Sequence, residues 1–423
     1  MMESVKERLM RYVDEHKQEL FDTLCELVRI NTENLGTGGN ERPLSELMHA
    51  AFGRLGIESE LYSPDDVPGL VQDPDYLAGR NLADRPNVTA RIAGKAPRKA
   101  LMLAGHLDTV PIGDRSLWSN EPLGGVIKDG KIYGRGANDD KHALAVELFV
   151  AKAFRELGVE LQNDLYLTGY VDEEFGGGDG ALACCVKYPC DFYINMDSDY
   201  MDVIHSGVGG QRLAINLRHR ELQSSCEAMI EAIYLTKKEI DKFGARRRAE
   251  MASDFYYKNS NIPQTALRYM NVVTGLNTND RHLGTVDFAY YTNQPRERIE
   301  CEYEELFENI RKAVAPLDIS LDSVTYRSRF FCYAATEPAH PCIAILQNSA
   351  KTVSKKQLKV TGMCLSDLNI FINRSGGNAV SCGICRDFGV EGGAHLPDEY
   401  VICDELVEFT KLMIEFILEW DQA

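Results

Sequence analysis

Hydrophobic residues follow two different spacings along the chain. Between Ser4 and about Leu55 they recur at helical spacing, which predicts one helix before and one helix after the Asn- and Gly-rich loop NTENLGTGGNE. Further along, short β-branched and aliphatic runs predict strands. We expect these strands at residues 86–94, 99–110, 163–171, 190–197 and 379–384. A helical pattern lies between them at residues 141–158 and ends at Gly158.

The alternation of strands and helices predicts an α/β fold with a mostly parallel, helix-covered sheet. In such a sheet, functional residues collect at the carboxyl ends of the strands. The middle of the chain has a different order, with a strand, a long charged helix from about Ser224 to Met251, two strands and a further helix. We therefore predict an inserted α+β domain at residues 208–330, within a discontinuous larger domain formed by residues 1–207 and 331–423.

Composition narrows the class of protein. With 423 residues, of which 44% are hydrophobic and 26% charged, the chain is long enough for two or three domains and is typical of globular proteins. The net charge of -18 would repel nucleic acid, so we expect no nucleic-acid partner. The N-terminal segment lacks the apolar region of a signal peptide, and no run approaches the roughly 18 apolar residues of a membrane span. We expect no membrane association.

The cysteines point to a reducing compartment. Twelve cysteines without a secretion signal are typical of reduced thiols in the cytoplasm, where we expect the protein. Cys382 and Cys385 have the spacing of a redox or zinc pair, but the chain has no second pair of this kind. We interpret these two residues as core thiols, and Cys184, Cys185 and Cys190 likewise.

Acidic residues and histidines gather where the predicted strands end. LMLAGHLDTVP presents His106 and Asp108 two residues apart, on the same side of an extended backbone. A metal-binding imidazole usually donates its second N–H to a carboxylate or carbonyl, so one residue can bind a metal while the other supports it. Taken alone, a His-x-Asp sequence is weak evidence for a metal site.

Four further segments strengthen the case. They are KIYGRGANDDKHA with Asp139, VDEEFGGGDG with Glu173 and Glu174, YINMDSD with Asp197 and Asp199, and GGAHLPDEY with His395. Adjacent acids at a helix start can simply cap the helix, but paired glutamates without a basic neighbour repel each other unless a cation or proton stabilises them. Carboxylates with imidazoles suit zinc, and also cobalt or manganese, and a pair of such ions polarises a carbonyl and activates water. The conjunction predicts a two-metal hydrolase.

In their order and sequence, GHLDTVP, GRGANDDKHA, DEEFGGG, NMD and GAHLPDE resemble the family of aminoacylase, acetylornithine deacetylase, succinyl-diaminopimelate desuccinylase, glutamate carboxypeptidase and aminotripeptidase. The similarity extends from about Thr23 to the C-terminus. It implies a zinc-exopeptidase-like domain with an inserted lid, through which many members form homodimers. It also implies two divalent ions, zinc foremost, and hydrolysis of the amide bond of an N-acyl amino acid or a small peptide.

The resemblance implies a role for each site residue. Asp108 would support a metal-binding histidine, and Glu173 would be the general base, close to the activated water without being a ligand. The phase of the strand allows either Asp197 or Asp199 as a ligand, and only the resemblance favours Asp197. The ligands it implies are Asp139 bridging both ions, His106 and Asp197 at one ion, and Glu174 and His395 at the other.

The inserted domain departs from the family pattern. Where relatives carry a lid histidine that helps to hold the oxyanion, this chain has Gln223, and the nearby His219 is out of register and more typical of a surface position. Ala289 stands where many relatives place an arginine that grips a substrate carboxylate, and Arg374 is a candidate for that role instead. His142 replaces a glycine beside the bridging aspartate, and we interpret it as part of the first helical turn.

These departures leave three functions open. The first is hydrolysis of an N-acyl amino acid or small peptide. The second keeps the metal site but hydrolyses a non-peptide C–N bond, such as that of an aryl amine or a ureido group. The third is a metal-binding protein that has lost turnover together with the lid histidine.

Overall fold

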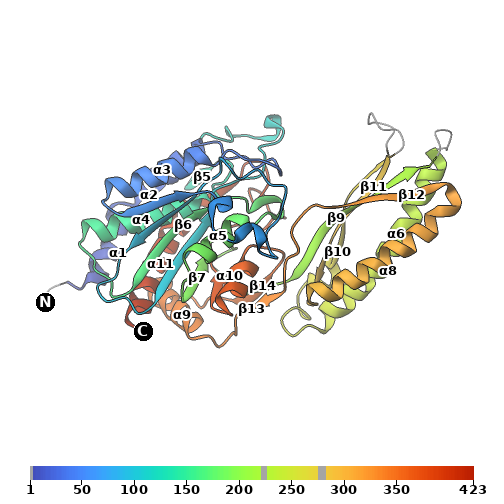
Figure 1. The fold of residues 1–423 in the computed structure, drawn as a ribbon. Helices are drawn as coiled ribbons and strands as arrows, with labels where there is room; N and C mark the ends of the chain where they lie inside the picture. Colours follow the sequence, from blue (N-terminus) through green and yellow to red (C-terminus); the bar gives the residue numbers. More distant parts are fainter. Residues whose placement is uncertain (1–2, 221–225, 275–282) are drawn as a thin grey trace. The chain divides into compact units, whose positions relative to one another are not determined.

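The computed structural model in Figure 1 describes residues 3–220, 226–274 and 283–423. The chain forms two compact units. The first comprises Met1–His205, Ala335–Thr361 and Ile370–Ala423, and the second comprises Ser206–Ala334 and Gly362–Asn369. None of the described helices is long and apolar enough to cross a membrane.

A large mixed sheet forms the centre of the first unit. Its strand order is β1-β2-β6-β3-β7-β15-β8-β13, with β14 beside β8. Pairing is parallel from β6 through β3 and β7 to β15, and antiparallel at β1, β2 and β8. The strands are β1 (Glu58–Tyr62), β2 (Asn87–Ile92), β3 (Ala100–His106), β6 (Asp164–Tyr170), β7 (Phe192–Asn195), β8 (Val203–Gly207), β13 (Ala334–Ala335), β14 (Val360–Met363) and β15 (Ala379–Ser381).

The predicted α/β fold is confirmed, and the pairings at the centre of the sheet, from β6 to β15, are parallel. Antiparallel edge strands on a parallel sheet are common. Helices accompany this sheet in Figure 1. They are α1 (Val5–Glu15), α2 (Lys17–Arg29), α3 (Arg42–Arg54), α4 (Lys141–Glu156), α5 (Asp179–Lys187), α9 (Pro341–Ser354), α10 (Leu368–Ser375) and α11 (Cys403–Gln422).

The segment before the Asn- and Gly-rich loop contains two helices where one was expected. The chain turns at His16, which ends α1 and begins α2 with φ -109° and ψ 15°. Its backbone N–H still donates to the Tyr12 carbonyl, and its ring stacks on the Tyr12 ring. A one-residue turn of this kind leaves the spacing of the apolar residues almost unchanged, so the hydrophobic pattern does not reveal it.

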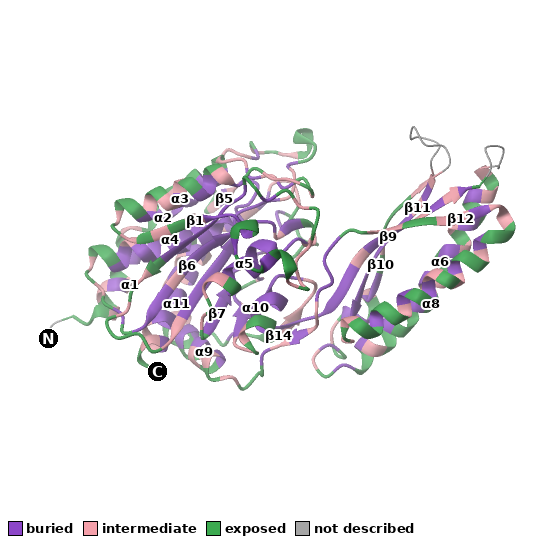
Figure 2. Cartoon of the chain, in the orientation of Figure 1, coloured by how far each residue is buried: buried purple, intermediate pink, exposed green. Residues whose placement is uncertain are grey.

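Strand alternation decides which side chains of β3 face the core. Leu101 and Leu103 enter the main hydrophobic core, which they share with residues of α4 and α11. Residues two apart on a strand face the same side, so the last residue, His106, points the other way. There its ring centroid lies 6.3 Å from that of Tyr170, which in turn meets Phe371 of α10. The strands are among the most buried elements, as the purple ribbon of Figure 2 shows.

A small sheet and several short helical turns complete the first unit. The small sheet has the order β16-β5-β4 and was not predicted, because its strands are only three residues long. Its strands are β4 (Val126–Lys128), β5 (Lys131–Tyr133) and β16 (Tyr400–Ile402). The 3-10 turns are η1 (Pro64–Asp66), η2 (Leu70–Gln72), η3 (Arg115–Leu117) and η4 (Glu174–Gly176).

The second unit is an antiparallel sheet with two long helices. Its strand order is β10-β11-β9-β12, and α6 and α8 pack together against it. Their apolar residues form a core of their own with those of the sheet. The elements are β9 (Gly209–His219), α6 (Cys226–Ser253), α7 (Ile262–Thr265), β10 (Leu267–Thr274), β11 (Leu283–Thr292), α8 (Arg296–Val314), η6 (Ala315–Leu317) and β12 (Ile319–Tyr326).

Candidate metal centre

Three neighbouring parallel strands bring the predicted site residues to one edge of the large sheet. β3 ends at His106, β6 ends shortly before the pair 173–174, and β7 ends two residues before Asp197. Parallel strands have their carboxyl ends at a common edge. Asp139 comes to this edge just before α4 begins, and His395 comes from the loop before β16.

The carboxylate of Asp139 lies between two imidazoles. Its Oδ1 is 2.9 Å from Nε2 of His106, and its Oδ2 is 3.2 Å from Nε2 of His395. Nε2 of His395 is also 3.0 Å from Oε2 of Glu174. One carboxylate that offers a separate oxygen to each of two histidines has the arrangement that a bridging ligand between two ions requires.

The charges around Asp139 call for a cation. Burial alone would lower the pKa of His106, but the hydrogen bond and the charge of Asp139 raise it well above its usual value. Burial and the charge of Asp139 raise the pKa of Asp197 to about 7, and the same two causes raise the pKa of Glu174. Carboxylates in such proximity repel one another unless protons or cations stabilise them.

The donor atoms present fit a divalent metal ion. One ligand atom from each of His106, Asp139 and Glu174 lies within 4.8 Å of the others, and all three residues are buried. Imidazole nitrogens with carboxylate oxygens are the ligands of catalytic zinc, and they also suit cobalt and manganese. The residues that would hold metal here are therefore those that the sequence singles out.

Asp197 and Asp199, which the sequence leaves as alternatives, have different surroundings. Burial and then the charge of Asp139 raise the pKa of Asp197, whereas burial and then the charge of Asp387 raise the pKa of Asp199 to about 6. Asp199 also forms a backbone bridge with Cys385. These differences favour Asp197 as the ligand.

Asp108 supports the centre in a way that differs from the expected one. Nδ1 of His106 lies 2.9 Å from the backbone carbonyl oxygen of Asp108, and 3.7 Å from its carboxylate. A proton on Nδ1 that is donated to the carbonyl leaves Nε2 free to bind metal. The carboxylate instead accepts the backbone N–H groups of Glu173 at 3.1 Å and Glu174 at 3.0 Å. Asp108 therefore holds the turn that carries the candidate base and a candidate ligand.

Asn34 was missed by the sequence reasoning. Its Nδ2 donates to Asp108 at 2.8 Å and to Asp172 at 3.2 Å, and all three side chains are fully buried. Asp172 is paired with Arg85, whose guanidinium also binds Glu41. The amide of Asn34 thus joins two buried carboxylates that would otherwise repel each other. It lies in the NTENLGTGGNE loop, and its isolated position gave no signal of this role.

Glu399, the last residue of the GAHLPDE motif, holds the loop that carries Asp139. Its Oε1 accepts the backbone N–H groups of Asn138 at 2.9 Å and Asp139 at 3.0 Å. Its other oxygen binds Arg135 of the GRGANDDKHA motif at 2.5 Å. Lys141 of the same motif donates to the carbonyl of Ile30 at 2.7 Å and so caps the end of α2. Both motifs therefore contain residues that fix the backbone of the site.

Arg374 does not have the free guanidinium that a substrate clamp needs. It forms ion pairs with Asp73 and Asp75, and both aspartates are mostly buried. These partners lie far away in the sequence, so the sequence alone did not reveal them. The structure argues against Arg374 as the carboxylate clamp.

Two of the departures in the inserted domain can be described, and a third cannot. His219 is buried at the end of β9, which corrects the expectation of a surface position. Ala289 of β11 pairs with Arg212 of β9 and Arg268 of β10, so arginines flank this position on both neighbouring strands. Gln223 lies outside the described residues.

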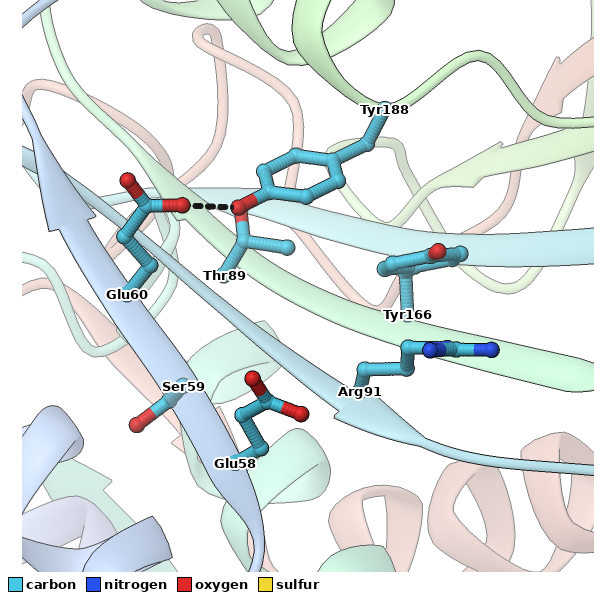
Figure 3. Close-up of a pocket in the computed structure, with 7 residues that line it drawn as sticks. All are labelled: Glu58, Ser59, Glu60, Thr89, Arg91, Tyr166 and Tyr188. Atoms are coloured by element: carbon cyan, nitrogen blue, oxygen red, sulfur yellow. Dashed lines mark hydrogen bonds between the residues drawn. The ribbon is translucent and has the colours of Figure 1, made fainter.

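A separate hollow of about 360 Å³ lies over β1, β2 and β6 (Figure 3). Glu60 accepts the hydroxyl of Tyr188 there, and Arg91, Tyr166 and Thr89 also line it. None of the predicted site residues lines this hollow. It is therefore distinct from the candidate metal centre.

Relatives of known activity align with the chain to different extents. N-formyl-4-amino-5-aminomethyl-2-methylpyrimidine deformylase of Bacillus subtilis is 24% identical over an alignment 465 residues long, gaps included. The alignment covers 97% of this chain and 97% of the deformylase. Succinyl-diaminopimelate desuccinylase of Cereibacter sphaeroides is 38% identical over 99 residues, which cover 23% of this chain and 26% of that enzyme.

Solved structures share the fold along the whole chain. A di-peptidase from Saccharomyces cerevisiae has a TM-score of 0.76 at 14% identity, with all of both chains covered. Human carnosine dipeptidase 1 has a TM-score of 0.73 at 16% identity and covers 99% of this chain and 100% of its own. At these identities the likeness establishes the fold alone.

A family model settles the membership that the motifs indicated. The model described as peptidase family M20/M25/M40 matches residues 102–419, which is well over half of the chain. The resemblance drawn from the sequence is confirmed. The chain belongs to peptidase family M20/M25/M40 and is a metallohydrolase of that family.

Proposed function

We propose that the protein hydrolyses the amide bond of an N-acyl amino acid or a small peptide, with two divalent ions bound by His106, Asp139, Glu174, Asp197 and His395. The observation that carries this proposal is the Asp139 carboxylate, whose two oxygens each face a different imidazole. Zinc is the proposed metal, because imidazoles and carboxylates are the ligands of catalytic zinc sites.

The chain's own residues supply the binding and the proton transfers. When bound, two such ions polarise the scissile carbonyl and lower the pKa of water. Glu173 directly precedes the proposed ligand Glu174 and is only partly buried. It accepts the proton of the attacking water and passes that proton to the leaving nitrogen, as a general base and then a general acid. Asp108 keeps Glu173 in place through the backbone N–H.

A second candidate substrate class is an N-formyl amine, in which the bond cleaved is not a peptide bond. The relative that covers 97% of this chain is named a deformylase of an aminomethylpyrimidine, whereas the desuccinylase covers only 23%. The loss of the family's arginine at Ala289 is compatible with a substrate that lacks a carboxylate.

Loading the purified protein with zinc, cobalt or manganese and assaying three substrate groups would separate these candidates. The groups are N-acyl amino acids, di- and tripeptides, and N-formyl amines. Turnover of either of the first two groups supports the first proposal, and turnover of the third alone supports the second. Inactivity against all of them would contradict both.

We further propose that the second unit is a lid and dimerisation domain and that the protein works in the cytoplasm. All twelve cysteines are free thiols, which suits a reducing compartment. β10 is an edge strand, and its Met270 and Val272 are half exposed, which suits contact with a second copy. Light scattering after size exclusion is expected to give the mass of a dimer, and a monomer at micromolar concentration would contradict this role.

Replacement of Glu173 by Gln removes the group proposed to move the proton and leaves the ligands in place. We expect kcat to fall by about a hundredfold to ten-thousandfold, with the metal content unchanged by elemental analysis. Glu160→Gln is the matched control, because Glu160 is exposed and pairs only with Lys95 among the described residues. Equal activity of the two variants would exclude Glu173 as the base.

Asp197→Asn and Asp199→Asn test which aspartate binds metal. We expect Asp197→Asn to lose one bound ion and most of its activity, because an amide is a poor replacement for a carboxylate ligand. Asp199→Asn makes the same change of charge two residues further along the chain and is expected to retain both ions. Metal content after dialysis measures the difference, and the reverse result would assign Asp199 as the ligand.

Asn34→Ala removes the amide that joins Asp108 to Asp172. Because these two carboxylates then repel each other, the turn that carries Glu173 should shift, and we expect kcat to fall about 10- to 100-fold with a smaller change in KM. Asn40→Ala is the control in the same loop, where the amide donates, among the described residues, only to the backbone carbonyl of Asn31. An Asn34→Ala variant as active as Asn40→Ala would show that the amide does not position the base.

A further inference from the structure

A second group of potential ligands lies beside the Asp139 centre. One ligand atom from each of Asp140, His142 and Cys385 lies within 4.8 Å of the others. Asp140 and His142 are completely buried, and Cys385 is 3% exposed. Asp140 and His142 come from the start of α4, whereas Cys385 follows β15, so the group joins two separate parts of the first unit.

Two of these atoms lack hydrogen-bond partners in the part of the chain that the structure describes. They are Oδ1 of Asp140 and Nδ1 of His142, which are 3.3 Å apart but poorly aligned for a hydrogen bond. Buried polar atoms are rarely left without a partner, and such an atom often marks an ion or water. Among the described residues no lysine or arginine forms an ion pair with Asp140.

The three side chains offer an oxygen, a nitrogen and a sulfur as ligand atoms. This ligand set differs from that of the Asp139 centre because it includes a thiol. Thiolate and imidazole together select zinc and similar thiophilic ions over magnesium or calcium. The backbone carbonyls of Asn138 and Met196 face the His142 ring, and the backbone N–H of Ile384 lies 3.4 Å from its Nε2. These contacts hold the imidazole beside Asp140 and Cys385.

We propose that Asp140, His142 and Cys385 form a further metal site, separate from the Asp139 centre, for a thiophilic divalent cation such as Zn²⁺. The ion relieves the unpaired Asp140 oxygen and fixes the start of α4 to the segment after β15. The other oxygen of Asp140 accepts the backbone N–H of His106 at 3.2 Å, so the site also supports the end of β3. This proposal does not rest on turnover by the Asp139 centre.

The proposed site adjoins the Asp139 centre through Asp197. Sγ of Cys385 lies 3.8 Å from Oδ1 of Asp197, which is only partly buried. An ion that has reached Asp197 is therefore close to the thiol. The same proximity raises a competing possibility, in which Cys385 is a ligand of the Asp139 centre itself, and the experiment must separate the two.

Titration of the chelator-treated full-length protein with Co²⁺ tests the site directly. A thiolate bound to Co²⁺ gives an intense near-ultraviolet charge-transfer band, which oxygen and nitrogen ligands do not give. We expect the wild-type protein to develop this band and to retain one more equivalent of Co²⁺ than Cys385→Ser after gel filtration. His142→Gln should lose the same equivalent and the band, while both variants keep the remaining ions.

Cys382→Ser is the matched control, because Cys382 is also completely buried and its thiol only donates to the Met201 carbonyl among the described residues. It should behave as the wild type does. If the wild-type protein saturated with Co²⁺ shows no such band, the proposal is overturned without the need for any variant. Asp140 and His142 are then a metal-free carboxylate and imidazole pair. If the wild-type protein develops the band but Cys385→Ser and Cys382→Ser retain equal amounts of Co²⁺, the thiol is a ligand of the Asp139 centre and the proposal is overturned. Loss of every ion in Cys385→Ser leads to the same conclusion.

Discussion

The shared carboxylate of Asp139 is the constraint on which the rest of the centre depends. Two imidazoles lie within 3.2 Å of it, and one of them, His395, is also 3.0 Å from the Glu174 carboxylate. Asp139 and Glu174 are buried, where unbalanced charge is costly. The fold therefore places acids together where a cation would compensate their charge. Because metal binds only the folded arrangement, its binding energy also stabilises that arrangement. Binding and stability are linked through this one side chain.

The surrounding residues make the arrangement rigid by holding the backbone rather than the ligands' side chains. Glu399 receives the N–H of Asp139, and Asp108 receives those of Glu173 and Glu174. Carboxylates are well suited to this purpose, since each accepts two or more N–H groups and forms strong charge-assisted hydrogen bonds. The acidic residues of the site therefore serve two purposes. Some are the proposed ligands of the cations, and others hold the loops that present those ligands.

The sequence predicted the ends of β3, β6 and β7, and with them His106 and Glu174, because strand ends and adjacent acids are local features. Contacts between distant segments could not be predicted in this way. Asn34 reaches Asp108 across 74 positions of sequence, and Arg374 is occupied by aspartates some 300 positions away. Neither partner has a local pattern. The buried position of His219 was likewise invisible, since a histidine at a strand end is equally common at a surface.

A centre of this kind determines the reaction more closely than the substrate. The dipeptidases that share this fold at 14% and 16% identity and the deformylase that aligns along the whole chain are named for different amides. The proposed metal ions and general base would act on the carbonyl and the leaving nitrogen, which all amides possess, so this chemistry does not distinguish among them. Discrimination must come from residues that touch the groups on either side of the scissile bond. In this chain those residues are to be sought where it departs from its family, as at Ala289 with its flanking arginines, and not among the ligands.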